Sequence, residues 1–164
     1  MKAEEVDAVW REIAPPVSPD EITGKRAKGL PPDKIAYLAL DARWNRHLLI
    51  LVPDDTPEIV FKETRSLVVK TEKFRVGFNP EALYVDLACI DSTQFSTFNV
   101  VTQDMLRLLR EGKGPIRDSI LAGLARWRAF WSMPQTELTR KEALGLFGEL
   151  WFMARWLGPV SSKI

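Results

Sequence analysis

Cysteine and histidine are nearly absent from this 164-residue chain, which contains one of each, Cys89 and His47. A single cysteine excludes an intramolecular disulfide framework and a cysteine-based zinc site, and Cys89 lies in an apolar run. We therefore expect Cys89 to be a buried core thiol. His47 opens a predicted strand, and no serine or cysteine nucleophile can be assigned to it. We interpret His47 as a surface or edge histidine.

Long apolar runs and an excess of charge of either sign are also missing. No stretch of about 18 apolar residues and no signal peptide occurs, which predicts a cytoplasmic protein without a membrane partner. The 23 basic and 22 acidic residues give a net charge of +1, so no global field favours nucleic acid or membrane. The sequence also lacks a phosphate-binding glycine loop, a Gly-x-Ser-x-Gly elbow and a His-Glu-x-x-His motif.

Hydrophobic residues make up 46% of the chain, enough for one domain with a core, or for one domain and a piece of a second. Turn signals divide the chain into three parts. Residues 1–33 hold a helix and a proline-rich connector, residues 34–132 an antiparallel sheet with following helices, and residues 133–164 a further helix. We predict an α+β fold: an antiparallel sheet of about four or five strands followed by three α-helices packed on it, plus the short N-terminal helix.

Local patterns give the bounds of these elements. Residues 3–14 have an amphipathic helical period, and the prolines that follow make 15–32 an extended, mostly exposed connector. Residues 58–62 are a candidate short strand, and Trp127 fits an apolar helical stripe that places it in the core. The other predicted strands are 35–41, 47–52, 67–76 and 82–90, and the predicted later helices are 96–111, 116–131 and 139–158.

Cations and aromatic residues alternate in the loop of the first predicted hairpin. Packing does not demand a large ring there, and the mixture suits nucleic acid through phosphate contacts and base stacking. Arg43, Trp44 and Arg46 are therefore candidate DNA contacts. A second basic cluster, for which a solvated loop is the alternative, lies in the connector and consists of Lys25, Arg26 and Lys28.

One carboxylate, Glu149, lies in the most apolar turn of the predicted helix 139–158. A buried carboxylate is costly unless it is paired, hydrogen-bonded or bound to a metal. The interpretations left open are a structural partner such as Arg155 or Arg126, exposure on a narrow polar strip with Glu142, or a carboxylate directed at a metal or phosphate site. Three aspartates at or near predicted strand ends fit such a metal site in type, although turns and caps explain them as well: Asp41, Asp86 and Asp91.

The segments 126–131 and 138–152 resemble a bacterial family of PD-(D/E)XK-motif proteins. The most specific piece is the block Leu-Thr-x-x-Glu-Ala-Leu-Gly-Leu-Phe-Gly-Glu-Leu, which begins at Leu138, and the upstream elements are similar from about Lys34 onward. Members of this family accompany DNA methyltransferases and ATPases in restriction and phage-defence clusters. The resemblance implies a restriction endonuclease-like parent hydrolase that depends on magnesium, with DNA, other restriction-system subunits or a second copy of the chain as partners.

The chain departs from that family in one respect. The family's nuclease signature, an Asp and then a Glu/Asp-x-Lys on adjacent strands, comes after the Gly-Glu-Leu-Trp helix, whereas no such pair follows Glu149 here. We therefore expect residues 133–164 to be the first helix of a truncated nuclease-like core, and the chain to be the amino-terminal, DNA-recognition or docking part of the parent, without cleavage activity of its own.

Only Glu149 is carried over from the family, as an auxiliary catalytic and metal-binding residue. Magnesium prefers several oxygen ligands in octahedral geometry, so one carboxylate cannot hold it. We therefore expect no cofactor in this chain and magnesium only in the parent. The alternative function is a non-enzymatic protein–protein interaction module or an oligomerisation domain.

Overall fold

The computed structural model describes residues 3–61 and 66–132 of the chain. All of them belong to the first of the two units into which the chain divides, Met1–Ser132. The predicted helix 139–158 and its Glu149 lie in the second unit, outside the described residues.

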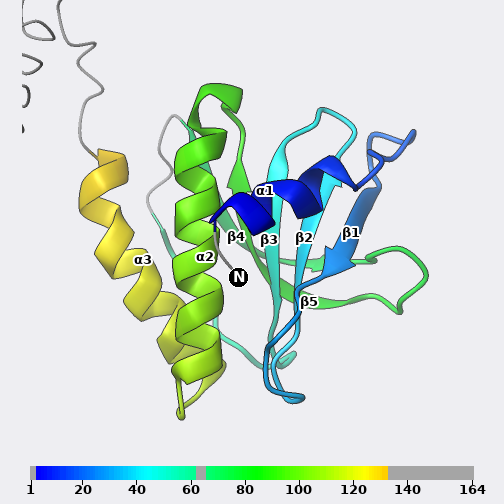
Figure 1. The fold of residues 1–164 in the computed structure, drawn as a ribbon. Coiled ribbons are helices and arrows are strands. Elements are labelled where there is room, and N and C mark those ends of the chain that lie inside the picture. Colours follow the sequence, from blue (N-terminus) through cyan, green and yellow to red (C-terminus); the bar gives the residue numbers. More distant parts are fainter. Residues whose placement is uncertain (1–2, 62–65, 133–164) are drawn as a thin grey trace, which may run out of the picture. The chain divides into compact units, whose positions relative to one another are not determined.

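Three helices and a five-stranded antiparallel sheet make up the described part (Figure 1). This confirms the predicted α+β fold, with the third of the three later helices outside the described residues. The elements in chain order are α1 (Ala3–Arg11), β1 (Ile22–Arg26), β2 (Ala36–Asp41), β3 (Arg46–Leu51), β4 (Leu67–Phe74), β5 (Ala82–Cys89), the 3₁₀ turn η1 (Ser92–Gln94), α2 (Phe95–Glu111) and α3 (Ile116–Ser132).

The strands lie in the order β1-β2-β3-β5-β4, and every neighbouring pair is antiparallel. The two predicted hairpins, β2–β3 and β4–β5, are confirmed, and the pairing of β3 with β5 joins them. The connector is not wholly unpaired, because Ile22–Arg26 forms the edge strand β1 along β2. The short strand expected at 58–62 is wrong for residues 58–61, which form no strand; residue 62 is not described.

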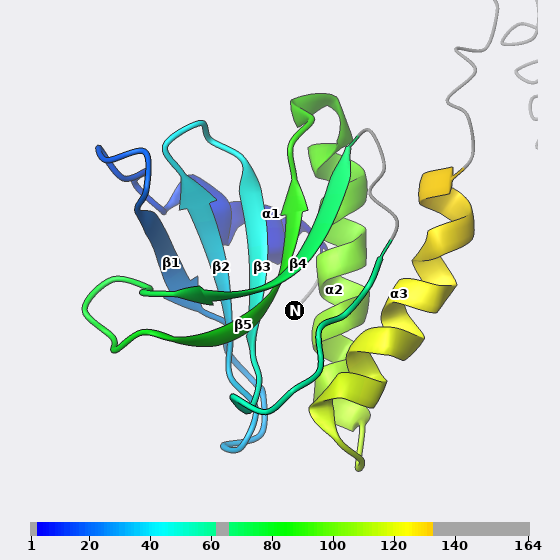
Figure 2. The same cartoon turned by 180° about the vertical axis from the view of Figure 1, so that it is seen from behind.

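Helices α1 and α2 cover one face of the sheet, and α3 packs against α2, as the two opposite views show (Figures 1 and 2). Alternation along the strands sends apolar side chains to this face, where they meet the apolar stripes of α1 and α2. Trp10 and Phe98 are fully buried there, with ring centroids 5.7 Å apart. The buried sheet residues of this core include Leu38, Leu48, Ile50, Leu67, Val85 and Leu87.

The opposite face is partly closed by the β4–β5 hairpin. The chain beyond β4 reaches back across the sheet, and Val76 forms an isolated bridge with Ile22 of β1. A second, smaller apolar cluster fills the space between them, and it includes Ala39, Leu49 and Tyr84. The remaining end of this face carries polar side chains.

Two polar side chains tie the helices to their surroundings through specific hydrogen bonds. Lys34 is 6% exposed, and its Nζ donates to the carbonyl oxygen of Leu109 at 2.9 Å and to that of Gly112. These carbonyls end α2 and have no partner inside the helix. Asp104 on α2 accepts from Trp127 Nε1 on α3 at 3.0 Å. Trp127 packs against the core, as predicted.

Cys89 is fully buried in the apolar core, as expected. Burial raises the pKa of its thiol to about 11, so the reactive thiolate is scarce at neutral pH. Among residues 3–61 and 66–132, no helix combines the length and apolarity that a bilayer crossing requires.

Candidate functional site

The β2–β3 turn is organised by the side chain of Asp41, the last residue of β2. Its Oδ1 accepts from the backbone amides of Arg43 at 2.9 Å and Asn45 at 2.8 Å. Its Oδ2 accepts from Asn45 Nδ2 at 2.7 Å. An aspartate that binds backbone amides in this way fixes a turn. These hydrogen bonds, together with the charge of His47, lower the pKa of Asp41, although burial acts in the opposite direction.

Trp44 is held in an unusual conformation at this turn. Its φ of +65° is the only positive φ of a non-glycine residue in the described part of the chain. Bulky residues rarely adopt this left-handed region, which costs about 1 to 3 kcal/mol. The residue gains little burial in return, since it is 61% exposed. Arg43 beside it is also exposed, so the turn presents a ring and a cation to solvent.

Arg46 is placed differently from the expectation. Its side chain is only 12% exposed, and its Nη1 donates to Asp7 Oδ1 at 2.8 Å and to Asn99 Oδ1 at 2.7 Å. The guanidinium also lies over the rings of Trp10 and Phe95, at 4.9 and 4.3 Å from their centroids. These groups belong to α1 and α2. Arg46 therefore holds the helices on the sheet and does not offer its charge to a phosphate.

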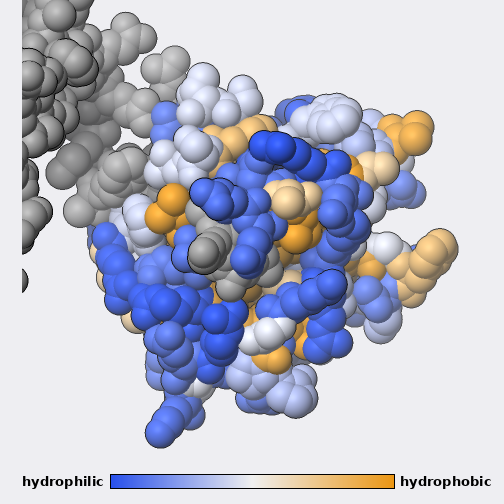
Figure 3. Space-filling view, viewed as in Figure 1, coloured by the Kyte–Doolittle hydropathy of each residue, from blue (hydrophilic) through white to orange (hydrophobic). Residues whose placement is uncertain are grey.

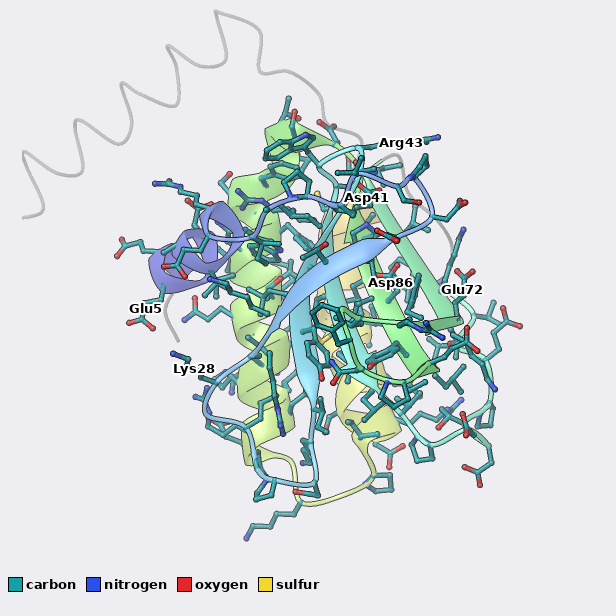
Figure 4. All side chains as sticks on the ribbon, turned by 90° about the vertical axis from the view of Figure 1, so that its right-hand side faces the viewer. Glu5, Lys28, Asp41, Arg43, Glu72 and Asp86 are labelled. Atoms are coloured by element: carbon teal, nitrogen blue, oxygen red, sulfur yellow. The ribbon has the colours of Figure 1, made fainter. Side chains whose placement is uncertain are left out.

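The second basic cluster lies around β1. Lys25 Nζ donates to Glu12 Oε2 at 2.8 Å, and this pair lowers the pKa of Glu12. Arg26 and Lys28 are exposed. All three line a groove of about 570 Å³ that also holds Glu5. Lys28 and Arg43 lie on opposite sides of the view in Figure 4. The two basic groups are therefore separate surfaces.

The interpretation of His47 as a surface or edge residue is wrong. It is 9% exposed on β3, which lies between β2 and β5. Its Nδ1 lies 3.0 Å from both carboxylate oxygens of Asp86, and its Nε2 faces Asp41 Oδ2 at 3.5 Å. Burial opposes a charge on the ring, but the hydrogen bond and charge of Asp86, followed by Asp41, outweigh it and raise the pKa of His47.

Asp86 is likewise not a strand-end residue. It lies within β5, opposite Leu49 of β3 and Lys70 of β4, and is 5% exposed. Asp91, in contrast, is a cap, as one of its two interpretations proposed: its Oδ1 accepts from Thr93 N at 3.0 Å at the start of η1.

His47 and Asp86 lie at the floor of a groove of about 560 Å³ on the face opposite the helices. The turn contributes Asp41 and Asn45 to its wall. Figure 4 shows Asp41, Asp86 and Glu72 on the same side of the sheet, with Arg43 at the upper end. The remaining charged residues of the groove come from β4 and from the segment before β1: Asp20, Glu21, Lys70, Glu72 and Lys73.

A metal site does not form from these side chains. Within the described ranges, no three His, Cys, Asp or Glu residues converge closely enough to hold a metal ion. His47 instead hydrogen-bonds Asp86 through Nδ1 and faces Asp41 with Nε2. The candidate metal residue Glu149 lies outside the described part of the chain.

Sequence reasoning identified the turn but missed the His47–Asp86 pair. The usable signal was the alternation of side chains along a strand. It places His47 on the same face as the apolar Leu49, and Asp86 on the same face as Tyr84, which indicates burial of both polar residues. This alternation does not show which strands are neighbours in the sheet. His47 and Asp86 belong to different hairpins, β2–β3 and β4–β5, and the pairing of β3 with β5 brings them together.

A family model whose description reads "Putative PD-(D/E)XK family member, (DUF4420)" matches residues 6–164 of the chain. The match extends over the sheet, the helices and the segment 133–164 alike. The comparisons with curated proteins and with solved structures gave no match.

Proposed function

The chain belongs to this family of PD-(D/E)XK-like proteins, and from that premise we propose that its first unit serves DNA recognition or docking for a restriction-type endonuclease in phage defence. Nucleases of this class act on a polyanion. A unit that serves them needs a surface that meets phosphates and bases, and the exposed β2–β3 turn is our candidate for that surface.

The observation that carries the proposal is the strained, exposed Trp44 beside the exposed Arg43. Neither folding nor packing explains a tryptophan with a positive φ in solvent, and such strain is typical of functional sites. Arg43 supplies a phosphate contact and Trp44 a ring on which a base stacks. Asp41 accepts from the backbone amides of both, through its Oδ1 for Arg43 and through its carbonyl for Trp44, so little conformational freedom is lost on binding.

The described residues do not fit the magnesium site that the family's name implies, because no set of three ligands converges among them. Metal-dependent hydrolysis would activate water and stabilise developing charge. We assign no step of that chemistry to residues 3–61 and 66–132. Glu149 stays a proposed auxiliary ligand of the parent enzyme.

The test is binding of duplex and of single-stranded DNA by the 164-residue chain over a series of salt concentrations. Phosphate contacts release counterions, so the logarithm of the affinity should fall linearly with the logarithm of salt. Arg43→Ala should reduce this slope by about 1, the loss of one phosphate contact. Arg128→Ala, which removes an exposed arginine from α3, is the matched control and should leave the slope unchanged. Absence of binding at low salt would favour the protein-interaction alternative.

A further inference from the structure

A second exposed aromatic residue lies on the β4–β5 hairpin. Phe78 is fully exposed, although the turn around it is well built. Gly77 adopts a φ of +58°, which glycine alone adopts without strain. The backbone N and side-chain Nδ2 of Asn79 donate to the Val76 carbonyl at 3.2 and 2.9 Å. Asn79 Nδ2 also lies 3.3 Å from the Tyr37 hydroxyl. The hairpin therefore holds Phe78 in solvent by a specific set of bonds.

The β2–β3 turn and strand β4 of the hairpin both contribute to the lining of one groove, whereas the two rings themselves, Trp44 and Phe78, lie outside that lining. Asp41 and Asn45 of the turn line it from one side, and Glu72, Lys73 and Phe74 of β4 line it where the hairpin begins. In the two opposite views the β2–β3 turn lies at the upper end of the sheet, and the tip of the β4–β5 hairpin projects past β1 at mid-height (Figures 1 and 2). Hydrophobic colour marks the hairpin tip in the space-filling view (Figure 3). Trp44 and Phe78 thus come from the two elements that border one polar groove.

Charges around the groove favour one orientation of a nucleic-acid strand. Each aromatic residue has an exposed arginine near it in sequence, Arg43 beside Trp44 and Arg75 three residues before Phe78. The groove itself carries two lysines and five carboxylates, those of Asp20, Glu21, Asp41, Glu72 and Asp86. Carboxylates repel phosphates and accept hydrogen bonds from the amino groups of bases. A strand would therefore lie with its backbone near the arginines and its bases toward the sheet.

We propose that Trp44 and Phe78 stack on unpaired bases of one DNA strand, so that the substrate class of this surface is single-stranded or locally opened DNA. This inference rests on the proposed function and names the form of DNA that it concerns. A base in an intact duplex has both faces covered by its neighbours, whereas an unpaired base can stack on an aromatic side chain. Two exposed rings on separate rigid turns therefore suit stacking on unpaired bases.

The test compares a fluorescently labelled single strand with a duplex of the same length, both bound to the 164-residue chain. We expect tighter binding of the single strand. Phe78→Ala should lower that affinity by about 5- to 100-fold, the range for loss of one base–aromatic stack. Val60→Ala, which shortens another exposed apolar side chain (92% exposed), is the control and should have no effect. Circular dichroism verifies that each variant is folded.

The outcomes separate this inference from the proposed function. Equal affinity for both DNA forms, or equal effects of Phe78→Ala and Val60→Ala, would overturn the inference while salt-dependent duplex binding upheld the proposed function. Absence of binding to either form would overturn the proposed function, and the inference with it.

Discussion

Arg46 of β3 and Asp7 of α1 form an ion pair with 2.8 Å between Nη1 and Oδ1. The same guanidinium reaches Asn99 of α2 at 2.7 Å, so one side chain joins the sheet to two helices. Hydrogen bonds from Asn99 and Arg46 lower the pKa of Asp7, although burial acts in the opposite direction. Arg46, the first residue after the turn, thus faces the interior of the fold, whereas Arg43 within the turn faces the solvent.

Replacing Arg46 should therefore lower stability. Arg46→Ala removes the donor of the Asn99 amide oxygen and leaves Asp7 with only Asn99 Nδ2 and Arg11 as partners, and we expect a loss of about 3 kcal/mol in the free energy of unfolding. The measurement is the urea midpoint. Arg43→Ala, at an exposed arginine of the same turn, should change stability by less than about 0.5 kcal/mol. Equal midpoints for the two variants would contradict the assignment of Arg46 to the fold.

His47 should make stability depend on pH near neutrality. Its pKa is raised above the ordinary value of 6.5, so protonation favours the folded state. The contribution is complete below about pH 6.5 and is lost as the pH rises through the raised folded-state value. We therefore expect the free energy of unfolding to fall as the pH rises through that window. Unfolding curves at a series of pH values measure it.

His47→Gln provides the control for that pH dependence. His47 is the only histidine of the chain, and burial raises the pKa of Cys89 to about 11, well above this range. The variant should be less stable below about pH 6.5 and lose most of the slope. A wild-type protein with the same stability across the window would show that the Asp86 pair does not favour the imidazolium.

Lys34 should be needed at the end of α2. Lys34→Met preserves the apolar stem but leaves the carbonyls of Leu109 and Gly112 without their donor. We expect a loss of about 1 to 3 kcal/mol, the cost of an unsatisfied buried polar group. Lys113→Met changes an exposed lysine next to the same helix end and should have little effect. Thermal unfolding of both variants tests this, and equal melting temperatures would refute it.

Much of the fold follows from local patterns in the sequence. The segments that form β2, β3, β4 and β5 alternate between apolar and polar residues or are apolar throughout. Glycine or proline residues lie next to the ends of α2 and α3 in the sequence. Strand β1 was missed for a physical reason. Ile22-Thr-Gly-Lys-Arg is short and carries no apolar period, and it becomes a strand because β2 offers its edge.

The candidate site was only partly predictable for the same kind of reason. Trp44 stood out because a large ring in a short loop has no packing role, and the structure finds it exposed. Arg46 is two residues further on and looks alike in sequence, but the pleat directs it toward α1 and α2. The environment of His47 depends on the pairing of β3 with β5, which no local pattern reports.

The central claim is that the β2–β3 turn binds DNA through Arg43 and Trp44. The most direct measurement is fluorescence anisotropy of labelled DNA at low salt with the wild-type chain and with the double variant Arg43→Ala, Trp44→Ala. Our account predicts binding by the wild type, and a loss of at least about tenfold in the double variant with an unchanged urea midpoint. Equal affinity of the two folded proteins for DNA would contradict it.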